Sequence, residues 1–331
     1  MRTKFNCKNE YCYITGEVLS PTETDEHIIP NALGGNLKSN KLVLSRINTG
    51  LFDRLDVELI KRIEISYLFE FKRDYGKKPP LKVSTLEGMS YWIHNSKDIK
   101  MASMKPFEVL NENGEVFEKF PLHQKEDIIA ARLKKHPHLK REDVEKSIIE
   151  EKAIVPQTAL FEHSLNVIDN SVNSFRAIAK IAANFAVLNN VEKTFTNLIS
   201  FIKGELALQH VNLGYFYPKQ LLSYNFDVNE VSHILYLKGS KTQKLLYCYI
   251  ELFNLHCFIV ILNYNYWGDD FSNSYVWDVR TRQELQKDIS LNLSKEDIEP
   301  PYYPYYFDLN RDYTERLFRL SNLLDLKIKK Q

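Results

Sequence analysis

The sequence contains only four cysteines and no long apolar run in its 331 residues. So few thiols in so long a chain do not make a disulfide scaffold, and a reducing compartment, the cytoplasm, is the expected location. The densest apolar stretch is "CFIVIL" at 257–262, far shorter than the roughly 18 apolar residues that indicate a membrane span. The start, "MRTKFNCKNE", lacks the apolar region of a signal peptide. We therefore expect a chain that neither crosses a membrane nor depends on disulfides.

An excess of either charge is also missing, because 44 Lys and Arg residues face 43 Asp and Glu residues and the net charge is only +1. Nucleic-acid binders often carry a strong surplus of basic residues. If this chain binds nucleic acid, its positive charge must be concentrated locally. The composition, 44% hydrophobic and 26% charged, is that of an ordinary globular protein.

Local patterns predict a strand, loop, strand, helix unit near the N-terminus. "EHIIP" at 26–30 is typical of a short strand that ends in proline, and "KLVL" at 41–44 of a second strand. Ser45 is placed to cap a helix with Asn48 in its first turn, because leucines recur at helical spacing after it. Gly50 is unfavourable inside a helix, so we expect this helix to begin irregularly.

The remainder of the chain changes character several times. We expect β-hairpins over 81–122, charged helices over 124–153, a long amphipathic helical region over 156–190 and β-strands from 230 to 290. The fold class is therefore α+β. We divide the chain into an N-terminal domain, a β-hairpin and charged helical connector, and a C-terminal α+β domain, at 1–78, 79–155 and 156–331.

The stretch "TDEHIIPNALGGNLKSNKLVLSRIN" at 24–48 combines a carboxylate–imidazole pair with the spaced asparagines Asn40 and Asn48. Glu26 and His27 are neighbours, so on a strand they point to opposite faces and meet at one site only if the strand twists or ends there. A histidine takes a proton from water near neutral pH. Carboxylate and amide oxygens suit a hard divalent cation. These are the parts of a one-metal site that hydrolyses phosphodiesters.

This stretch resembles the HNH endonuclease family, whose core is a ββα-metal fold. "DEHIIPNALGG" is similar, almost letter for letter, to the middle of one subgroup's pattern, and "NKLVLSRIN" looks like the second strand and helix start. The resemblance covers about residues 10–60. It implies that His27 is the general base and that Asn40 positions its loop. It also implies that Glu26 and Asn48 hold one Mg²⁺ or Mn²⁺ ion.

The scaffold of that family is altered in this chain. Its four structural cysteines would fall at Cys12, Thr15, Leu44 and Ile47, so three of the four are missing. A tetrahedral structural zinc needs all four ligands. We therefore predict no structural zinc and expect apolar packing of Leu44 and Ile47 in its place. The later segment "FRAIAKIAANFA" at 175–186 resembles longer members of the family, and we assign it no chemistry.

The resemblance implies a metal-dependent endonuclease that hydrolyses DNA, with Lys38, Lys41 and Arg46 close enough to contact phosphates. Family members of this size often serve restriction or anti-phage defence. The C-terminal region would select the target, dimerise or join a partner protein. Two alternatives stay open: the same fold acting on RNA, and a non-catalytic module that binds nucleic acid or protein, which the lost zinc ligands favour.

Simpler explanations stand beside several of these residues. Asn48 can merely cap its helix, while Asp25 and Asp56 suit structural or phosphate-side roles better than metal ligation. "YWGDD" at 266–270 is more typical of a turn than of a second metal site. The tyrosines at 302–306 suit packing better than stacking on bases.

Overall fold

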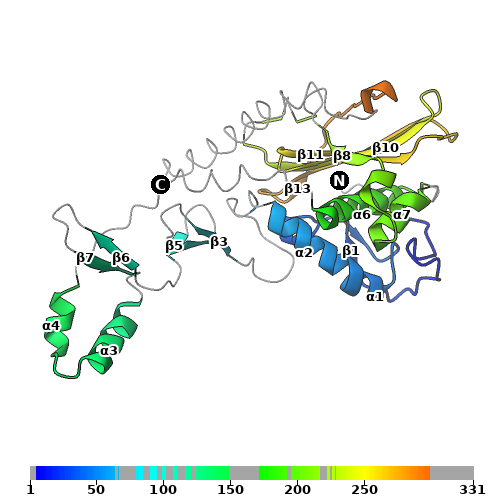
Figure 1. Cartoon of the computed structure of the whole chain (residues 1–331). Coiled ribbons are helices and arrows are strands. Elements are labelled where there is room, and N and C mark those ends of the chain that lie inside the picture. The colour runs from blue at the N-terminus through cyan, green and yellow to red at the C-terminus, as the bar shows by residue number, and fades with distance from the viewer. Residues whose placement is uncertain are drawn as a thin grey trace. The chain divides into compact units, whose positions relative to one another are not determined.

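The computed structural model describes residues 5–63, 66, 80–84, 90–94, 99–101, 107–110, 116–120, 124–148, 171–191, 195–216, 222–223, 226–227 and 229–298. The chain forms two compact units, Met1–Lys78 with Ile168–Gln331 in one and Pro79–Val167 in the other. The fold is mixed α+β, with N-terminal strands followed by a helix and a C-terminal β-sheet (Figure 1).

The first and last of the three predicted domains lie in the same compact unit. The physical reason is helix α6 (Val172–Leu188), which packs against α2 (Asp53–Arg62) of the N-terminal part and against strands of the C-terminal sheet. Whether each of the three predicted ranges folds alone stays a prediction.

The N-terminal part contains the predicted strand, loop, strand and helix. Strand β1 (Glu26–His27) pairs antiparallel with β2 (Lys38–Ser39). The prediction of the second strand at 41–44 is wrong, because these residues pack on the N-terminal loop instead: the Tyr13 N–H donates to the Leu42 carbonyl at 3.2 Å. The apolar side chains of this segment are buried without belonging to the strand pair.

The helix that follows begins at Ser45 and has an irregular start, as predicted. It runs through α1 (Ser45–Ile47), a π-helical segment (Asn48–Phe52) and α2. The prediction that Ser45 caps this helix is wrong, because Ser45 is its first helical residue. The cap is Glu23, whose Oε2 accepts hydrogen bonds from the Ser45 N–H at 2.5 Å and the Ser45 hydroxyl at 2.6 Å. These bonds lower the pKa of Glu23. A carboxylate here satisfies free backbone N–H groups at a helix N-terminus.

The double glycine has a backbone reason at each position. Gly34 ends the short 3-10 helix Asn31–Leu33 with φ of +86°, a left-handed conformation that glycine adopts without strain. At Gly35, a Cβ atom would lie 2.0 Å from the carbonyl oxygen of Ile29. Only glycine allows this close return of the loop onto the end of β1.

Helix α6 is the centre of the larger unit. Nearly all of its side chains are buried, as expected of a helix with apolar residues around its whole circumference. It contacts α2, α7 (Thr196–Lys203) and strands of the C-terminal sheet, and Figure 1 shows it between α2 and that sheet. The helix therefore joins the N-terminal part to the sheet.

The C-terminal sheet has six antiparallel strands in the order β13-β12-β9-β10-β11-β8. This confirms the predicted strands between 230 and 290, and the segment at 266–270 forms the connection between β11 and β12. The strands are β8 (Leu213–Tyr215), β9 (Ser232–Ser240), β10 (Leu245–Leu252), β11 (His256–Asn263), β12 (Phe271–Asp278) and β13 (Gln283–Glu284).

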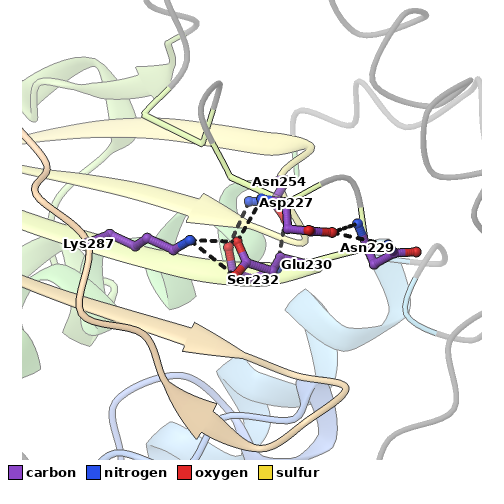
Figure 2. Close-up of polar contacts among 6 residues, drawn as sticks. All are labelled: Asp227, Asn229, Glu230, Ser232, Asn254 and Lys287. Carbon is purple, nitrogen blue, oxygen red and sulfur yellow. Dashed lines mark hydrogen bonds and ion pairs between the residues drawn. The ribbon is translucent and has the colours of Figure 1, made fainter.

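Polar contacts fix the end of the sheet at which β9 begins (Figure 2). Asn254, in the turn between β10 and β11, accepts a hydrogen bond from the Ser232 N–H at 2.7 Å and donates to the Ser232 hydroxyl at 2.8 Å. Lys287 Nζ contacts both carboxylate oxygens of Glu230, at 2.8 and 3.1 Å. These bonds hold the start of β9, the strand that meets the N-terminal loop.

The second unit contains the predicted hairpins and charged helices. Strands β3, β4 and β5 form one antiparallel sheet and β6 and β7 another. The helical pair is interrupted around Pro137, as predicted. Its elements are β3 (Leu81–Ser84), β4 (Ser90–Ile93), β5 (Ile99–Met101), β6 (Phe107–Leu110), β7 (Val116–Lys119), α3 (Lys125–Lys135) and α4 (Arg141–Lys146).

Some predictions fall on parts of the chain that the structure does not describe. The first half of the helical region predicted over 156–190, and the tyrosines at 302–306, lie outside the described residues. Among the helices within the described ranges, none is long and apolar enough to cross a membrane.

The glycine argument predicts opposite outcomes at two sites of the same segment. Gly35→Ala should lower the free energy of unfolding by about 1–3 kcal/mol or more, because the added methyl group overlaps the Ile29 carbonyl. Gly50 lies in a helical segment, and a Cβ added there would have no atom within 4 Å. Gly50→Ala should therefore be neutral or raise the free energy of unfolding by about 0.5–1 kcal/mol. Urea unfolding of both variants measures the difference, and equal stabilities would contradict the predicted close approach.

Candidate functional site

Strand β1 places Glu26 and His27 back to back. Glu26 is paired with Ser39 and His27 with Lys38. Adjacent strand residues point to opposite faces, and both residues are buried, with 3% of the surface of Glu26 and 6% of that of His27 exposed. Glu26 is directed toward helix α6, so the two members of the predicted pair have different surroundings.

Glu26 belongs to a buried polar group that we call the Lys180 cluster, made of Tyr13, Glu26, Asp56, Lys180 and Asn184. Lys180 Nζ lies 2.7 Å from Glu26 Oε1 and 2.7 Å from Asp56 Oδ1. Asn184 Nδ2 donates to Glu26 Oε1 at 2.9 Å, and the Tyr13 hydroxyl donates to Asn184 Oδ1 at 2.7 Å. The exposed fractions of the charged side chains are 0% for Lys180, 4% for Glu26 and 17% for Asp56.

The cluster contains one ammonium group for two carboxyl groups. Burial raises the pKa of Glu26 to about 7, although Lys180 acts in the opposite direction. Burial also raises the pKa of Asp56. Burial alone would lower the pKa of Lys180, but Asp56 and Glu26 raise it. Lys180 is therefore firmly charged, while one carboxyl group is close to taking up a proton.

The other face of the strand pair carries His27 and Lys38. Residues directly opposite each other on paired strands share a face, so the Lys38 side chain starts beside His27. Lys38 Nζ forms an ion pair with Asp25 Oδ2 at 3.3 Å, and these two side chains are 41% and 50% exposed. A histidine with a solvent-accessible cation next to it thus lies on the face opposite the Lys180 cluster.

The two predicted asparagines both hold the segment that leads into β1. Asn40 Nδ2 donates to the Pro21 carbonyl at 3.3 Å. Asn48 Nδ2 donates to Thr24 Oγ1 at 3.0 Å and to the Asp25 carbonyl at 3.1 Å. Their amide groups fix the path of the backbone just before Glu26 and His27.

The predicted phosphate-contacting residues are all accessible from solvent. Lys38, Lys41 and Arg46 are all exposed. Lys41 Nζ donates to the Cys7 carbonyl at 3.2 Å, and Arg46 pairs with Glu17. A phosphate would have to compete with these contacts, which are weak at exposed positions.

The contacts of Glu26, one of the two predicted metal ligands, do not suit a divalent cation in this arrangement, and metal ligation by Asn48 stays a prediction. A Mg²⁺ ion needs oxygen ligands with open positions around them, whereas the Glu26 carboxylate is buried and bonded to an ammonium and an amide group. Within the described residues, no group of three or more His, Cys, Asp or Glu side chains is arranged to hold a metal ion.

The four positions at which the HNH subgroup that the sequence resembles has zinc-binding cysteines differ in burial in this chain. Cys12 and Leu44 are buried, Ile47 is half-buried, and Thr15 is exposed. Tyr13 lies in the same turn as Thr15 and extends its hydroxyl into the Lys180 cluster. The turn is therefore held both by apolar packing and by the hydrogen bond of Tyr13. The absence of structural zinc stays a prediction.

The loop after β1 is held from the C-terminal sheet. His233 Nε2, on β9, lies 2.8 Å from the Leu33 carbonyl, and Trp277 Nε1, on β12, donates to the Gly34 carbonyl at 3.0 Å. The Phe253 N–H donates to His233 Nδ1 at 3.3 Å, which leaves Nε2 as the donor. Burial lowers the pKa of His233 to about 4, so this ring is neutral near pH 7.

Sequence reasoning missed five of these contact residues: Tyr13, Lys180, Asn184, His233 and Trp277. Lys180 and Asn184 carried a signal, because they are polar residues at helical i, i+4 spacing inside the otherwise apolar "IAKIAANFA". The assignment of no chemistry to this segment overlooked that signal. His233 and Trp277 carried none, since strands often contain such residues and their contacts lie in a distant part of the chain.

In comparisons with known proteins, no protein-family model, no curated protein and no solved structure matches this chain. The HNH resemblance of residues 10–60 therefore stays a prediction from the sequence.

Removing the ammonium from the Lys180 cluster should be costly. Lys180→Met keeps an unbranched side chain but removes the ammonium group, which leaves two buried carboxyl groups without a cation, so we expect a loss of about 3–5 kcal/mol in the free energy of unfolding. The matched control is Lys203→Met on α7, where a partly exposed lysine pairs with Glu205. It should cost about 1 kcal/mol or less. Equal losses in denaturant unfolding would contradict the cluster's importance.

The raised pKa of Glu26 predicts a pH dependence of stability. Its value rises from 4.5 to about 7 on folding, so the stabilising contribution is complete below pH 4.5 and is lost as the pH rises through 7. The free energy of unfolding of the wild type, relative to Glu26→Gln, should therefore fall between these pH values and level off above them. Unfolding curves of both proteins across this range test the sign, and a difference that grows with pH would contradict it.

Proposed function

We propose that the protein is an HNH-type endonuclease that hydrolyses phosphodiester bonds in DNA, with His27 as the general base. The observation that carries the proposal is the order and pairing of the N-terminal elements: β1 with His27, the antiparallel β2, and then the helix that begins at Ser45. This strand, strand, helix order is the one that the sequence resemblance implies.

The chemistry of His27 supports the proposed role. The imidazole removes a proton from water, the resulting hydroxide attacks the phosphorus atom, and the bond to the 3′ oxygen breaks, after which that oxygen takes a proton from solvent. The exposed ammonium of Lys38, on the paired strand position, supplies positive charge for the phosphate. Asn40 and Asn48 keep the preceding backbone in place.

A requirement for Mg²⁺ or Mn²⁺ remains an expectation from the resemblance. A divalent cation would supply charge neutralisation at the phosphate, but Glu26 is engaged elsewhere and Asn48 holds the backbone before β1. Recognition of DNA by Lys38, Lys41 and Arg46, selection of the target or assembly through the C-terminal region, and service in cytoplasmic restriction or anti-phage defence extend the same proposal.

A second candidate function is favoured by the position of Glu26. A non-catalytic module derived from an HNH fold could tolerate a carboxylate that is buried against Lys180 and would use the exposed basic residues to bind nucleic acid. The two candidates differ in one measurable property, because only the first predicts cleavage that depends on His27.

Nicking of supercoiled plasmid in Mg²⁺, in Mn²⁺ and in EDTA tests the proposal. His27→Ala should lower the rate by about 10²–10⁴-fold, the usual contribution of a general base. The matched control is His210→Ala, which removes an exposed histidine of the same unit and should leave the rate unchanged.

Cleavage of the same plasmid at equal rates by the wild type and His27→Ala would remove His27 as the base. Reproducible absence of cleavage on modified DNA, unmodified DNA and structured RNA, together with retained binding, would favour the non-catalytic module. Cleavage of RNA alone would keep the chemistry and change the substrate.

A further inference from the structure

The Lys180 ammonium lies where a metal ion would lie between two acidic side chains. Its Nζ is 2.7 Å from an oxygen of Glu26 and 2.7 Å from an oxygen of Asp56, and the side chain is completely buried. The ring of Phe52 lies on another side, with its centroid 5.2 Å from Nζ. The cation is thus enclosed by two carboxyl groups and an aromatic face.

The remaining polar groups of the cluster complete this enclosure. Asn184 donates to the same Glu26 oxygen that Lys180 contacts, and its own oxygen accepts the hydrogen bond from Tyr13. The five residues come from four segments: the N-terminal turn, β1, α2 and α6. A bound metal ion joins separate segments in the same manner, because each ligand can come from a different part of the chain.

We propose that Lys180 is the resident cation of this site and that it takes the place a divalent metal would take opposite Glu26. Glu26 is then a structural anchor of β1 and not a metal ligand. A lysine side chain is part of the chain and does not have to be bound from solution, and its ammonium contacts Oε1 of Glu26, the same oxygen that Asn184 contacts. This assignment of Lys180 does not depend on the proposed nuclease activity.

Two consequences separate this proposal from a metal site at Glu26. First, the affinity of the wild type for any divalent cation that it binds should not depend on Glu26. Second, loss of the ammonium leaves the carboxyl groups of Glu26 and Asp56 facing one vacated position, and two carboxylates are suitable oxygen ligands for Mn²⁺.

The test uses the full chain and Mn²⁺ alone as the probe. Binding is followed by the electron paramagnetic resonance signal of free Mn²⁺, and thermal melts are recorded with and without Mn²⁺. The wild type and Glu26→Gln should bind Mn²⁺ with the same affinity, or neither should bind it. Lys180→Ala should melt at a lower temperature than the wild type and should gain several degrees on addition of Mn²⁺, while Lys203→Ala should behave as the wild type in both respects.

Either of two results would overturn the proposal. One is a loss of at least about tenfold in Mn²⁺ affinity on Glu26→Gln, the size expected when a metal site is damaged. The other is a Lys180→Ala protein that gains no more from Mn²⁺ than the wild type. If Lys180→Ala does not fold, the comparison of wild type with Glu26→Gln decides alone. Because no readout involves nicking, an absence of nuclease activity would contradict only the proposed function.

Discussion

The ammonium group of Lys180, enclosed by two carboxyl groups, ties the N-terminal part of the molecule to its central helix. Removing charges from water costs free energy that is offset only when every charged group has partners. Here Lys180 contacts Glu26 and Asp56, and Asn184 brings in Tyr13. The position of β1, and with it His27, therefore depends on a helix far away in the sequence.

A second support reaches the same segment from the sheet. The carbonyl groups of Leu33 and Gly34 accept hydrogen bonds from side chains on β9 and β12, while α6 holds Glu26 on β1. The backbone on either side of His27 is thus fixed by two different elements. A fixed backbone would hold the imidazole of His27 in one orientation, which proton transfer requires. The same rigidity would also suit a non-catalytic binding site.

Local patterns were sufficient for most elements of the fold. The strand at Glu26, the irregular helix start after Ser45 and the C-terminal strands follow from spacing, capping and residue type, which act over a few positions. The second strand was misplaced because pairing with β1 selects the polar residues of β2, while the apolar "KLVL" packs elsewhere. The partners of Glu26 could not be assigned, because Asn184 is 158 positions away.

The order of these segments along the chain has a consequence for synthesis. Residues 79–167, which form the other compact unit, separate β1 and α2 from the helix that completes their polar core. At ribosomal rates this interval corresponds to roughly 5–20 seconds. During that time Glu26 and Asp56 have no ammonium partner, so the N-terminal elements cannot reach their final arrangement. The segment around His27 therefore reaches its final arrangement only after helix α6 has been synthesised.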